Sequence, residues 1–160
     1  MIEQHLTIET DEGEMSTFVV RPESGEPFPV VLFLMDAPGK REELHDMARR
    51  IAATGYYVML PNLYYRDVPS FTVHREDPAS ARHMAQLMGN LSSAMVARDA
   101  SKLLEHAASD DAADADSVGV TGYCMSGPFA LWLAAEYPQR IKAAASVHGV
   151  RLATDADDSP

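Results

Sequence analysis

The sequence predicts an α/β domain built on a mostly parallel, doubly wound sheet, and three observations support this prediction. Apolar runs rich in β-branched residues alternate with segments of helical periodicity. The run 29–35 is apolar throughout, as is typical of strands covered on both faces. Polar or reactive residues stand at the ends of successive predicted strands, which share one ligand-binding edge in such sheets: Asp36, Asn62, Cys124 and His148.

The first half of the chain contains three predicted strands and one helix. Alternation of small or polar with apolar residues predicts a strand over 15–20, and apolar runs predict strands over 29–35 and 56–60. Between the last two, an apolar stripe at helical spacing predicts a helix over 42–54: Leu44, Met47, Ala48 and Ile51. The irregular stretch 62–78 is long enough to predict an active-site loop.

The second half continues the alternation. A helical region is expected over 79–108, with a break near Gly89 and Asn90. A solvated acidic connection over 109–116 should then lead to a strand over 117–121 that runs directly into Gly122. A helix over 128–137 and a strand over 143–148 complete the pattern.

Composition and charge exclude several classes of function. The chain has 160 residues and a net charge of −11, with 24 acidic and 13 basic side chains. Such a surface repels nucleic acids and anionic lipids. No apolar run approaches a membrane span, and the first residues lack the features of a signal peptide, so we expect a cytoplasmic protein. Cys124 is the only cysteine and forms no intrachain disulfide.

The segment Gly122-Tyr123-Cys124-Met125-Ser126-Gly127, between a predicted strand and a predicted helix, carries the most specific motif. The G-x-S-x-G elbow places a nucleophile on a tight strand-to-helix turn between small residues, and here Cys124 stands at the nucleophile position. A helix N-terminus lowers the pKa of a thiol, which favours the reactive thiolate. The Met125 amide is suited to stabilise an oxyanion.

Three other interpretations of this segment remain open. Ser126 is a second candidate nucleophile, although Cys124 and Pro128 stand where its flanking glycines should be. A nucleotide-binding loop is a further alternative, although the glycine spacing matches neither G-x-G-x-x-G nor a P-loop. In the last alternative, Cys124 is a buried and inert residue of a tight turn.

The same segment resembles the elbow of the dienelactone hydrolases, which use cysteine where most related enzymes use serine. Residues 120–127 resemble that elbow, residues 33–39 resemble the loop after the family's third strand, and residues 56–66 resemble its strand ending in a Pro-x-Leu-Tyr motif. The resemblance implies an α/β-hydrolase fold for residues 1–160 as a single domain. It also strengthens the prediction that Cys124 is the nucleophile.

The resemblance further implies roles for several residues. The family usually has Glu where this chain has Asp36, and that Glu is thought to help deprotonate the thiol; the alternative for Asp36 is a residue that anchors the following loop or helix. The Ala37 amide corresponds to the second oxyanion donor. Arg82, with Arg75 close by, corresponds to an arginine that binds a substrate carboxylate, although an exposed helical arginine is the alternative. Further predicted substrate contacts are Tyr123 and His148.

A catalytic base is not recognised in the sequence. A cysteine hydrolase needs a histidine oriented by an acid, in the order nucleophile, acid, histidine. His148 is the only histidine after Cys124, and as base it would leave only acids in the wrong order: Asp155, Asp157 and Asp158. The other histidines show no metal-binding spacing and are expected at the surface or in loops: His5, His45, His74, His83 and His106. We therefore predict no metal and no cofactor.

Truncation explains the missing base most simply. Completing this fold should take about two more strand-plus-helix units of ~30 residues each, so the triad Asp and His are expected beyond Pro160. The predicted function is hydrolysis of a small lactone or carboxylic ester through an acyl-enzyme at Cys124. The alternative is a non-enzymatic binding or assembly protein of the same fold that lacks the rest of the triad. The sequence indicates no oligomeric state.

Overall fold

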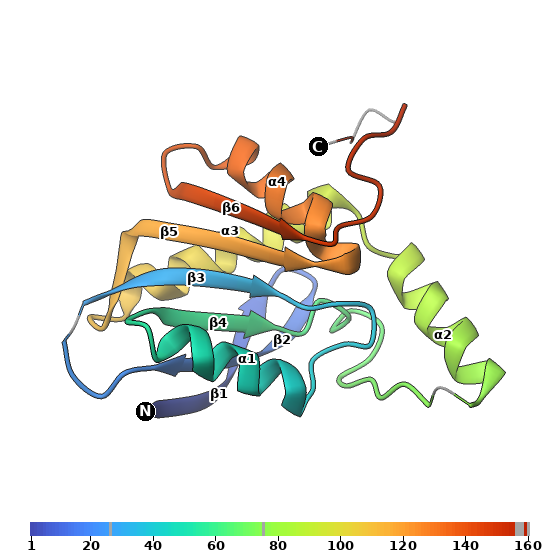
Figure 1. Ribbon diagram of the computed structural model, residues 1–160, viewed down its shortest axis with the longest axis horizontal. Coiled ribbons are helices and arrows are strands. Elements are labelled where there is room, and N and C mark those ends of the chain that lie inside the picture. The colour runs from blue at the N-terminus through green and yellow to red at the C-terminus, as the bar shows by residue number, and fades with distance from the viewer. Residues whose placement is uncertain (26, 75, 156–158, 160) are drawn as a thin grey trace.

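The computed structural model describes residues 1–25, 27–74, 76–155 and 159, and its centre is a six-stranded sheet (Figure 1). The strands are β1 (Ile2–Thr10), β2 (Gly13–Arg21), β3 (Phe28–Leu34), β4 (Tyr57–Pro61), β5 (Ala113–Tyr123) and β6 (Ile141–Val147), in the spatial order β1-β2-β4-β3-β5-β6. The pairs β1/β2 and β2/β4 are antiparallel, and β4/β3, β3/β5 and β5/β6 are parallel. This topology confirms the predicted α/β class with a mostly parallel sheet.

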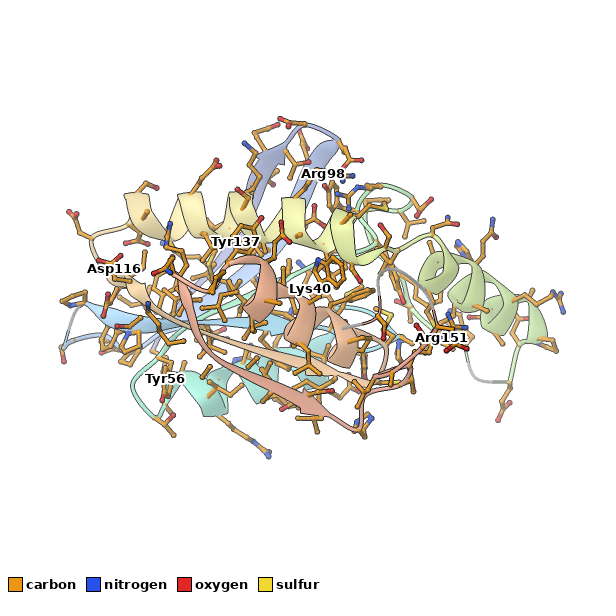
Figure 2. The ribbon with its side chains drawn as sticks, turned by 90° about the horizontal axis from the view of Figure 1, so that it is seen from above. Lys40, Tyr56, Arg98, Asp116, Tyr137 and Arg151 are labelled. Carbon is orange, nitrogen blue, oxygen red and sulfur yellow. The ribbon has the colours of Figure 1, made fainter. Side chains whose placement is uncertain are left out.

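Helices cover both faces of the sheet, as a doubly wound fold requires. They are α1 (Glu42–Ala52), α2 (Pro78–Gly89), α3 (Ser93–Ser109) and α4 (Gly127–Glu136), with a short 3-10 turn, η1 (Cys124–Ser126), before α4. Seen from above, α1 lies on one face and α3 and α4 lie on the other (Figure 2). The predicted break in the helical region is confirmed, because α2 ends at Gly89 and α3 begins at Ser93.

The N-terminal strand β1 was not among the predicted elements. It forms a hairpin with β2 in which Leu6 pairs with Thr17 and Ile8 with Met15. Gly13 has a φ of 133°, which a residue with a side chain rarely adopts, and it lets the chain reverse into β2. Most of β1 is exposed, so few of its residues are apolar, and the period-2 signal is weak.

The prediction of a solvated connection over 109–116 is wrong for residues 113–116, which form the start of β5. Ala113 pairs with Phe28 and Asp114 pairs with Pro29, so β5 begins four residues before the predicted strand. The residues Ala113 to Asp116 alternate alanine with aspartate, and both alanines pack against the core. This alternation is the period-2 pattern of a strand, which the high charge of the stretch obscured.

The two central parallel strands form the core of the sheet. All five residues of β4 are buried, and five of the seven residues of β3 are buried. Side chains on both faces of these strands are covered, which confirms the prediction made from the apolar run 29–35. Core packing therefore fixes the carboxyl ends of β3 and β4, from which two of the loops described below emerge.

The carboxyl ends of β3, β4, β5 and β6 point toward the same side of the molecule, and α2 lies beyond them (Figure 1). The described irregular residues 62–74 and 76–77, which fall within the loop predicted over 62–78, also lie at this side (Figure 1), and Pro78 begins α2. No helix in the described part of the chain is both long and apolar enough to span a membrane.

Candidate active site

The polypeptide turns sharply where β5 ends and α4 begins. Cys124 follows the last residue of β5, and its φ of 53° lies in the left-handed region that residues other than glycine rarely adopt. The turn η1 then leads directly into α4. Cys124 is a free, partly exposed cysteine. This strand–turn–helix geometry is the one that presents a nucleophile at the edge of a sheet in α/β-hydrolases.

Glycines flank this turn on both sides, and neither position has room for a side chain. A Cβ on Gly122 would lie 2.0 Å from the carbonyl oxygen of Ser126. A Cβ on Gly127 would lie 2.4 Å from Ser146 Oγ and 2.5 Å from the Cα of Gly149. Both glycines are therefore needed for close approach of the backbone. The motif predicts this at Gly122, whereas its second small position is Ser126 and Gly127 lies one residue beyond it.

Ser126 connects the turn to the end of β3. Its side chain is fully buried, and its hydroxyl donates a hydrogen bond of 2.5 Å to the carbonyl oxygen of Met35. A buried hydroxyl that is already bonded to the backbone is poorly placed to attack a substrate. The geometry therefore argues against Ser126 as the nucleophile and favours Cys124.

The carboxylate of Asp36, in the loop after β3, is held by Arg41. Arg41 donates hydrogen bonds of 2.5 Å to Oδ1 and 3.0 Å to Oδ2, and this pairing raises the pKa of the guanidinium. No hydrogen bond between Asp36 and Cys124 occurs among the described residues. The geometry fits the alternative in which Asp36 anchors the start of α1, and its role in deprotonating the thiol stays a prediction.

Ala37 lies in the same loop, and hydrogen bonds hold the peptide groups on both sides of its Cα. The Gly39 amide donates a hydrogen bond of 3.0 Å to the Asp36 carbonyl, which fixes the peptide that carries the Ala37 N–H. The Ala37 carbonyl accepts a hydrogen bond of 2.8 Å from the hydroxyl of Tyr64. Ala37 is only 6% exposed. A rigid backbone of this kind suits a residue whose amide is to bind an oxyanion.

Tyr64 was given no role by the sequence analysis, although it lies at the centre of this region. Its oxygen lies 3.2 Å from Met125 Sδ as well as 2.8 Å from the Ala37 carbonyl, and its side chain is fully buried. Burial raises the pKa of Tyr64 well above its usual range, and the negative charges of Asp36 and Cys124 act in the same direction. One signal for Tyr64 was present, because it closely follows the end of β4 at the shared sheet edge.

Tyr123 and His148 lie at the same sheet edge as Cys124. Their rings meet edge to face with centroids 6.3 Å apart, and the Tyr123 ring also contacts Phe33 at 5.2 Å. The Val150 amide donates a hydrogen bond of 3.2 Å to the Cys124 carbonyl, which holds the segment after β6 against the turn. His148 is exposed and has a φ of 42°. Tyr123 lines an open groove on the sheet face next to α1.

A cavity of about 680 Å³ opens next to Met125, between α2, the start of α4 and the segment after β6. Its walls include Met88, Phe129 and Arg151. Figure 2 shows Arg151 on the side of the molecule from which α2 extends. Arg82 is exposed on α2 and does not line this cavity, so its predicted contact with a substrate stays a prediction. Residues that the sequence analysis also considered lie outside the described residues: Arg75, Asp157 and Asp158.

The remaining histidines do not form a site. The expectation that all of them lie at the surface or in loops is wrong for His45, which lies in α1 with a side chain 13% exposed against the ring of Phe18. The apolar face of α1 accounts for this burial. Within the described ranges, no three His, Cys, Asp or Glu side chains come close enough together to hold a metal ion.

Comparisons with known proteins match almost the whole chain. The model of the dienelactone hydrolase family matches residues 15–160. A Methylorubrum extorquens protein named "Putative carboxymethylenebutenolidase" is 28% identical over 158 residues, which are 98% of this chain and 52% of that protein. A Yersinia pestis protein of the same name is 29% identical over 147 residues, 89% of this chain and 52% of its own length. The chain therefore spans about half the length of these curated relatives.

Solved structures agree with the family match. A crystal structure from Klebsiella pneumoniae described as a "Putative Dienelactone Hydrolase" superposes with a TM-score of 0.82 and 26% identity, covering 99% of this chain and 64% of that one. A dienelactone hydrolase from Anabaena variabilis gives a TM-score of 0.64 at 17% identity over 90% of this chain and 62% of its own, which shows the fold alone. The predicted α/β-hydrolase fold is confirmed. By the family match over residues 15–160, the chain belongs to the dienelactone hydrolase family.

Proposed function

We propose that the protein is a hydrolase that cleaves a small lactone or carboxylic ester through an acyl-enzyme at Cys124. The observation that carries the proposal is the turn at Cys124, where a partly exposed thiol with a φ of 53° stands between two glycines that have no room for a side chain. Such a turn holds the sulfur above the sheet edge, where a substrate carbonyl can reach it.

Catalysis would begin with attack of the thiolate on the carbonyl carbon. Helix α4 starts three residues after Cys124, and its N-terminal end carries a partial positive charge. The Met125 and Ala37 amides would stabilise the negative charge that develops on the carbonyl oxygen. Asp36 remains a proposed aid to deprotonation of the thiol.

The proposed substrate is a small molecule that binds at this edge of the sheet. The cavity beside Met125 has apolar walls and a cationic residue, Arg151, and therefore offers space for an ester with an anionic group. We retain Arg82, Tyr123 and His148 as proposed substrate contacts, because all three come from elements at the carboxyl ends of the strands (Figure 1). A cytoplasmic location suits a free thiol nucleophile, because the cytosol keeps thiols reduced.

The proposal concerns the acylation half of the reaction, because this chain spans about half the length of its curated relatives. Acylation requires the thiolate and the two amides, all of which residues 1–160 contain as one proposed domain. Deacylation needs a base, and the prediction of a histidine and an acid beyond Pro160 stays a prediction.

Intact-mass measurement after exposure to p-nitrophenyl acetate tests the proposal. We expect the wild-type protein to gain one acetyl group on Cys124 and the Cys124→Ala variant to gain none. Ser126→Ala is the matched control, because its hydroxyl lies in the same turn, and it should still be acetylated. Equal acetylation of wild type and Cys124→Ala would exclude Cys124 as nucleophile. Absence of acetylation in a folded wild type would favour the non-enzymatic alternative.

A further inference from the structure

We propose that Tyr64 is a positioning residue that holds the two oxyanion donors, the Ala37 and Met125 amides, in register with each other. The inference rests on the proposed function, because it assigns Tyr64 to the same site. The Tyr64 hydroxyl donates to the Ala37 carbonyl at 2.8 Å, and its oxygen lies 3.2 Å from Met125 Sδ. One buried group therefore contacts both residues whose amides would bind the oxyanion.

The hydrogen bond from Tyr64 holds the second of the two peptide groups that flank the Ala37 Cα in the loop after β3. The Gly39 amide already fixes the peptide that carries the Ala37 N–H, and Pro38 restricts Ala37 to extended conformations. Tyr64 holds the carbonyl on the other side of the Ala37 Cα. With both peptides held, the N–H has little freedom to turn away from the substrate, as preorganised stabilisation requires.

Tyr64 is itself held firmly enough to serve as a support. Asn62 accepts a hydrogen bond of 3.1 Å from the Tyr64 amide through its side-chain oxygen. The side-chain nitrogen of Asn62 donates to the carbonyls of Val68 and Pro69 at 3.2 and 3.1 Å, which closes the loop. The Tyr64 ring is fully buried and packs edge to face against the ring of Phe71, with the two ring centroids 6.1 Å apart. Burial of the ring and the hydrogen bond from the Tyr64 backbone amide therefore restrict where the hydroxyl can lie.

The ionisation state of Tyr64 suits this role. Burial and the charges of Asp36 and Cys124 raise the pKa of the hydroxyl, so it stays protonated when the thiol is ionised. A protonated hydroxyl donates to the Ala37 carbonyl throughout the reaction. The hydrogen bonds of the Tyr64 hydroxyl within the described part of the chain go to Ala37 and Met125 and not to Cys124, so we assign it a positioning role without proton transfer.

The step that Tyr64 would support is addition of the thiolate to an ester. The sulfur forms a bond to the carbonyl carbon, and the π electrons of the carbonyl move to its oxygen, which the two amides bind. Collapse of this intermediate restores the C=O bond and expels the alkoxide or phenoxide with its electron pair. Nucleophilic displacement of iodide from iodoacetamide uses the same thiolate but develops no oxyanion.

Comparing acetylation with alkylation of the same thiol distinguishes a positioning role of Tyr64 from a purely structural one, because only acetylation develops an oxyanion. We would measure the rate of acetylation by p-nitrophenyl acetate and the rate of alkylation by iodoacetamide on the same purified protein, in wild type and in Tyr64→Phe. Tyr64→Phe should lower the ratio of acetylation to alkylation by about tenfold, less than the loss of a whole oxyanion donor, while alkylation stays near the wild-type rate.

The matched control is Tyr57→Phe. Tyr57 is also fully buried, and its hydroxyl donates a bond of 2.8 Å to Asp110 at the other end of β4, so this variant loses a comparable bond and should keep the wild-type ratio. If Tyr64→Phe does not fold, Ala37→Gly loosens the same peptide and should lower the ratio in the same way.

The outcomes distinguish this inference from the proposed function. A wild-type ratio in folded Tyr64→Phe, or in Ala37→Gly if Tyr64→Phe does not fold, would overturn the positioning role while acetylation of Cys124 still stands. A wild-type protein that is alkylated but never acetylated would overturn the proposed function, and the inference with it. An equal loss in Tyr57→Phe would show that the ratio follows stability, and it would also overturn the inference.

Discussion

The adjacent residues Tyr64 and Tyr65 belong to two polar assemblies of different kinds. Both side chains are buried and both hydroxyls are hydrogen-bonded. Tyr64 turns toward the cysteine turn, where its partners, Ala37 and Met125, are uncharged. Tyr65 turns the other way and donates a bond of 2.9 Å to the buried carboxylate of Asp99 on α3.

The assembly around Tyr65 is a network of ion pairs. Arg66 donates two bonds to Asp99, at 3.0 and 2.6 Å, and a further bond of 2.7 Å to Glu12 in the turn of the N-terminal hairpin. The Cζ atom of its guanidinium also lies 4.5 Å from the centroid of the Tyr65 ring. The network contains no nucleophile and connects the hairpin, the loop after β4 and α3.

The comparison shows that one short segment, residues 64–66, contacts the cysteine turn on one side and the charged network on the other. Charged groups that neutralise each other in pairs join distant elements around Tyr65. The Tyr64 hydroxyl instead contacts two uncharged partners, and the ion pair in its neighbourhood, Asp36–Arg41, lies at the loop that also carries Ala37. We therefore expect changes near Tyr65 to alter stability, and changes near Tyr64 to alter acylation.

Substitution of Asp99 should have the largest effect on stability. Asp99 is 1% exposed and Arg66 is 11% exposed, so Asp99→Asn leaves a buried guanidinium without its main partner, and the free energy of unfolding should fall by about 3 kcal/mol. Urea unfolding measures this change. The control is Arg98→Ala, which breaks an exposed ion pair with Glu12 and should cost about 0.5 kcal/mol or less.

The same variant also tests the separation of the two assemblies. In conditions where Asp99→Asn remains folded, its ratio of acetylation to alkylation at Cys124 should equal that of wild type. A ratio that falls together with stability would show that the network and the cysteine turn act as one unit.

A substitution at Gly122 should reverse this pattern, with a smaller loss of stability and a large loss of acylation. The added Cβ of Gly122→Ala would lie 2.0 Å from a backbone carbonyl, so the turn must open, at a cost of about 2 kcal/mol. Displacement of the Met125 amide should abolish most acetylation. Gly119→Ala is the control in the same strand, because its Cβ would meet nothing nearer than 3.7 Å. Equal acetylation in the two variants would contradict the elbow geometry.

The sequence predicted the place of Cys124 because the elbow is a local motif. Glycine spacing, the preceding strand and the following helix all lie within a few residues of the thiol, so periodicity and residue size were sufficient. The sheet was predicted for the same reason, except where exposure or charge masked the pattern, in β1 and at the start of β5.

The supporting contacts were beyond sequence reasoning because their partners are far apart in the chain. Tyr64 is 27 residues from Ala37 and 61 residues from Met125, and these contacts exist only after β3, β4 and β5 have paired. The partner of Asp36 was also unpredicted. Arg41 is only five residues away, but two acidic neighbours, Glu42 and Glu43, compete for the same cation in the sequence.

Alkaline pH should give a gradual effect that compares the two regions without altering the backbone. Burial raises the pKa of Tyr65 from 10.0 to about 12, although its bond with Thr10 partly opposes the rise. Because the folded pKa lies above the unfolded one, this contribution to stability is fully present below pH 10 and is lost as the pH rises toward about 12. The free energy of unfolding should therefore decrease more steeply over this range in wild type than in Tyr65→Phe, as measured by urea unfolding at several pH values. Identical slopes in the two proteins would mean that the pKa of Tyr65 is the same in the folded and unfolded states. In that case the charged network, rather than burial of the Tyr65 hydroxyl, accounts for the stability of this region.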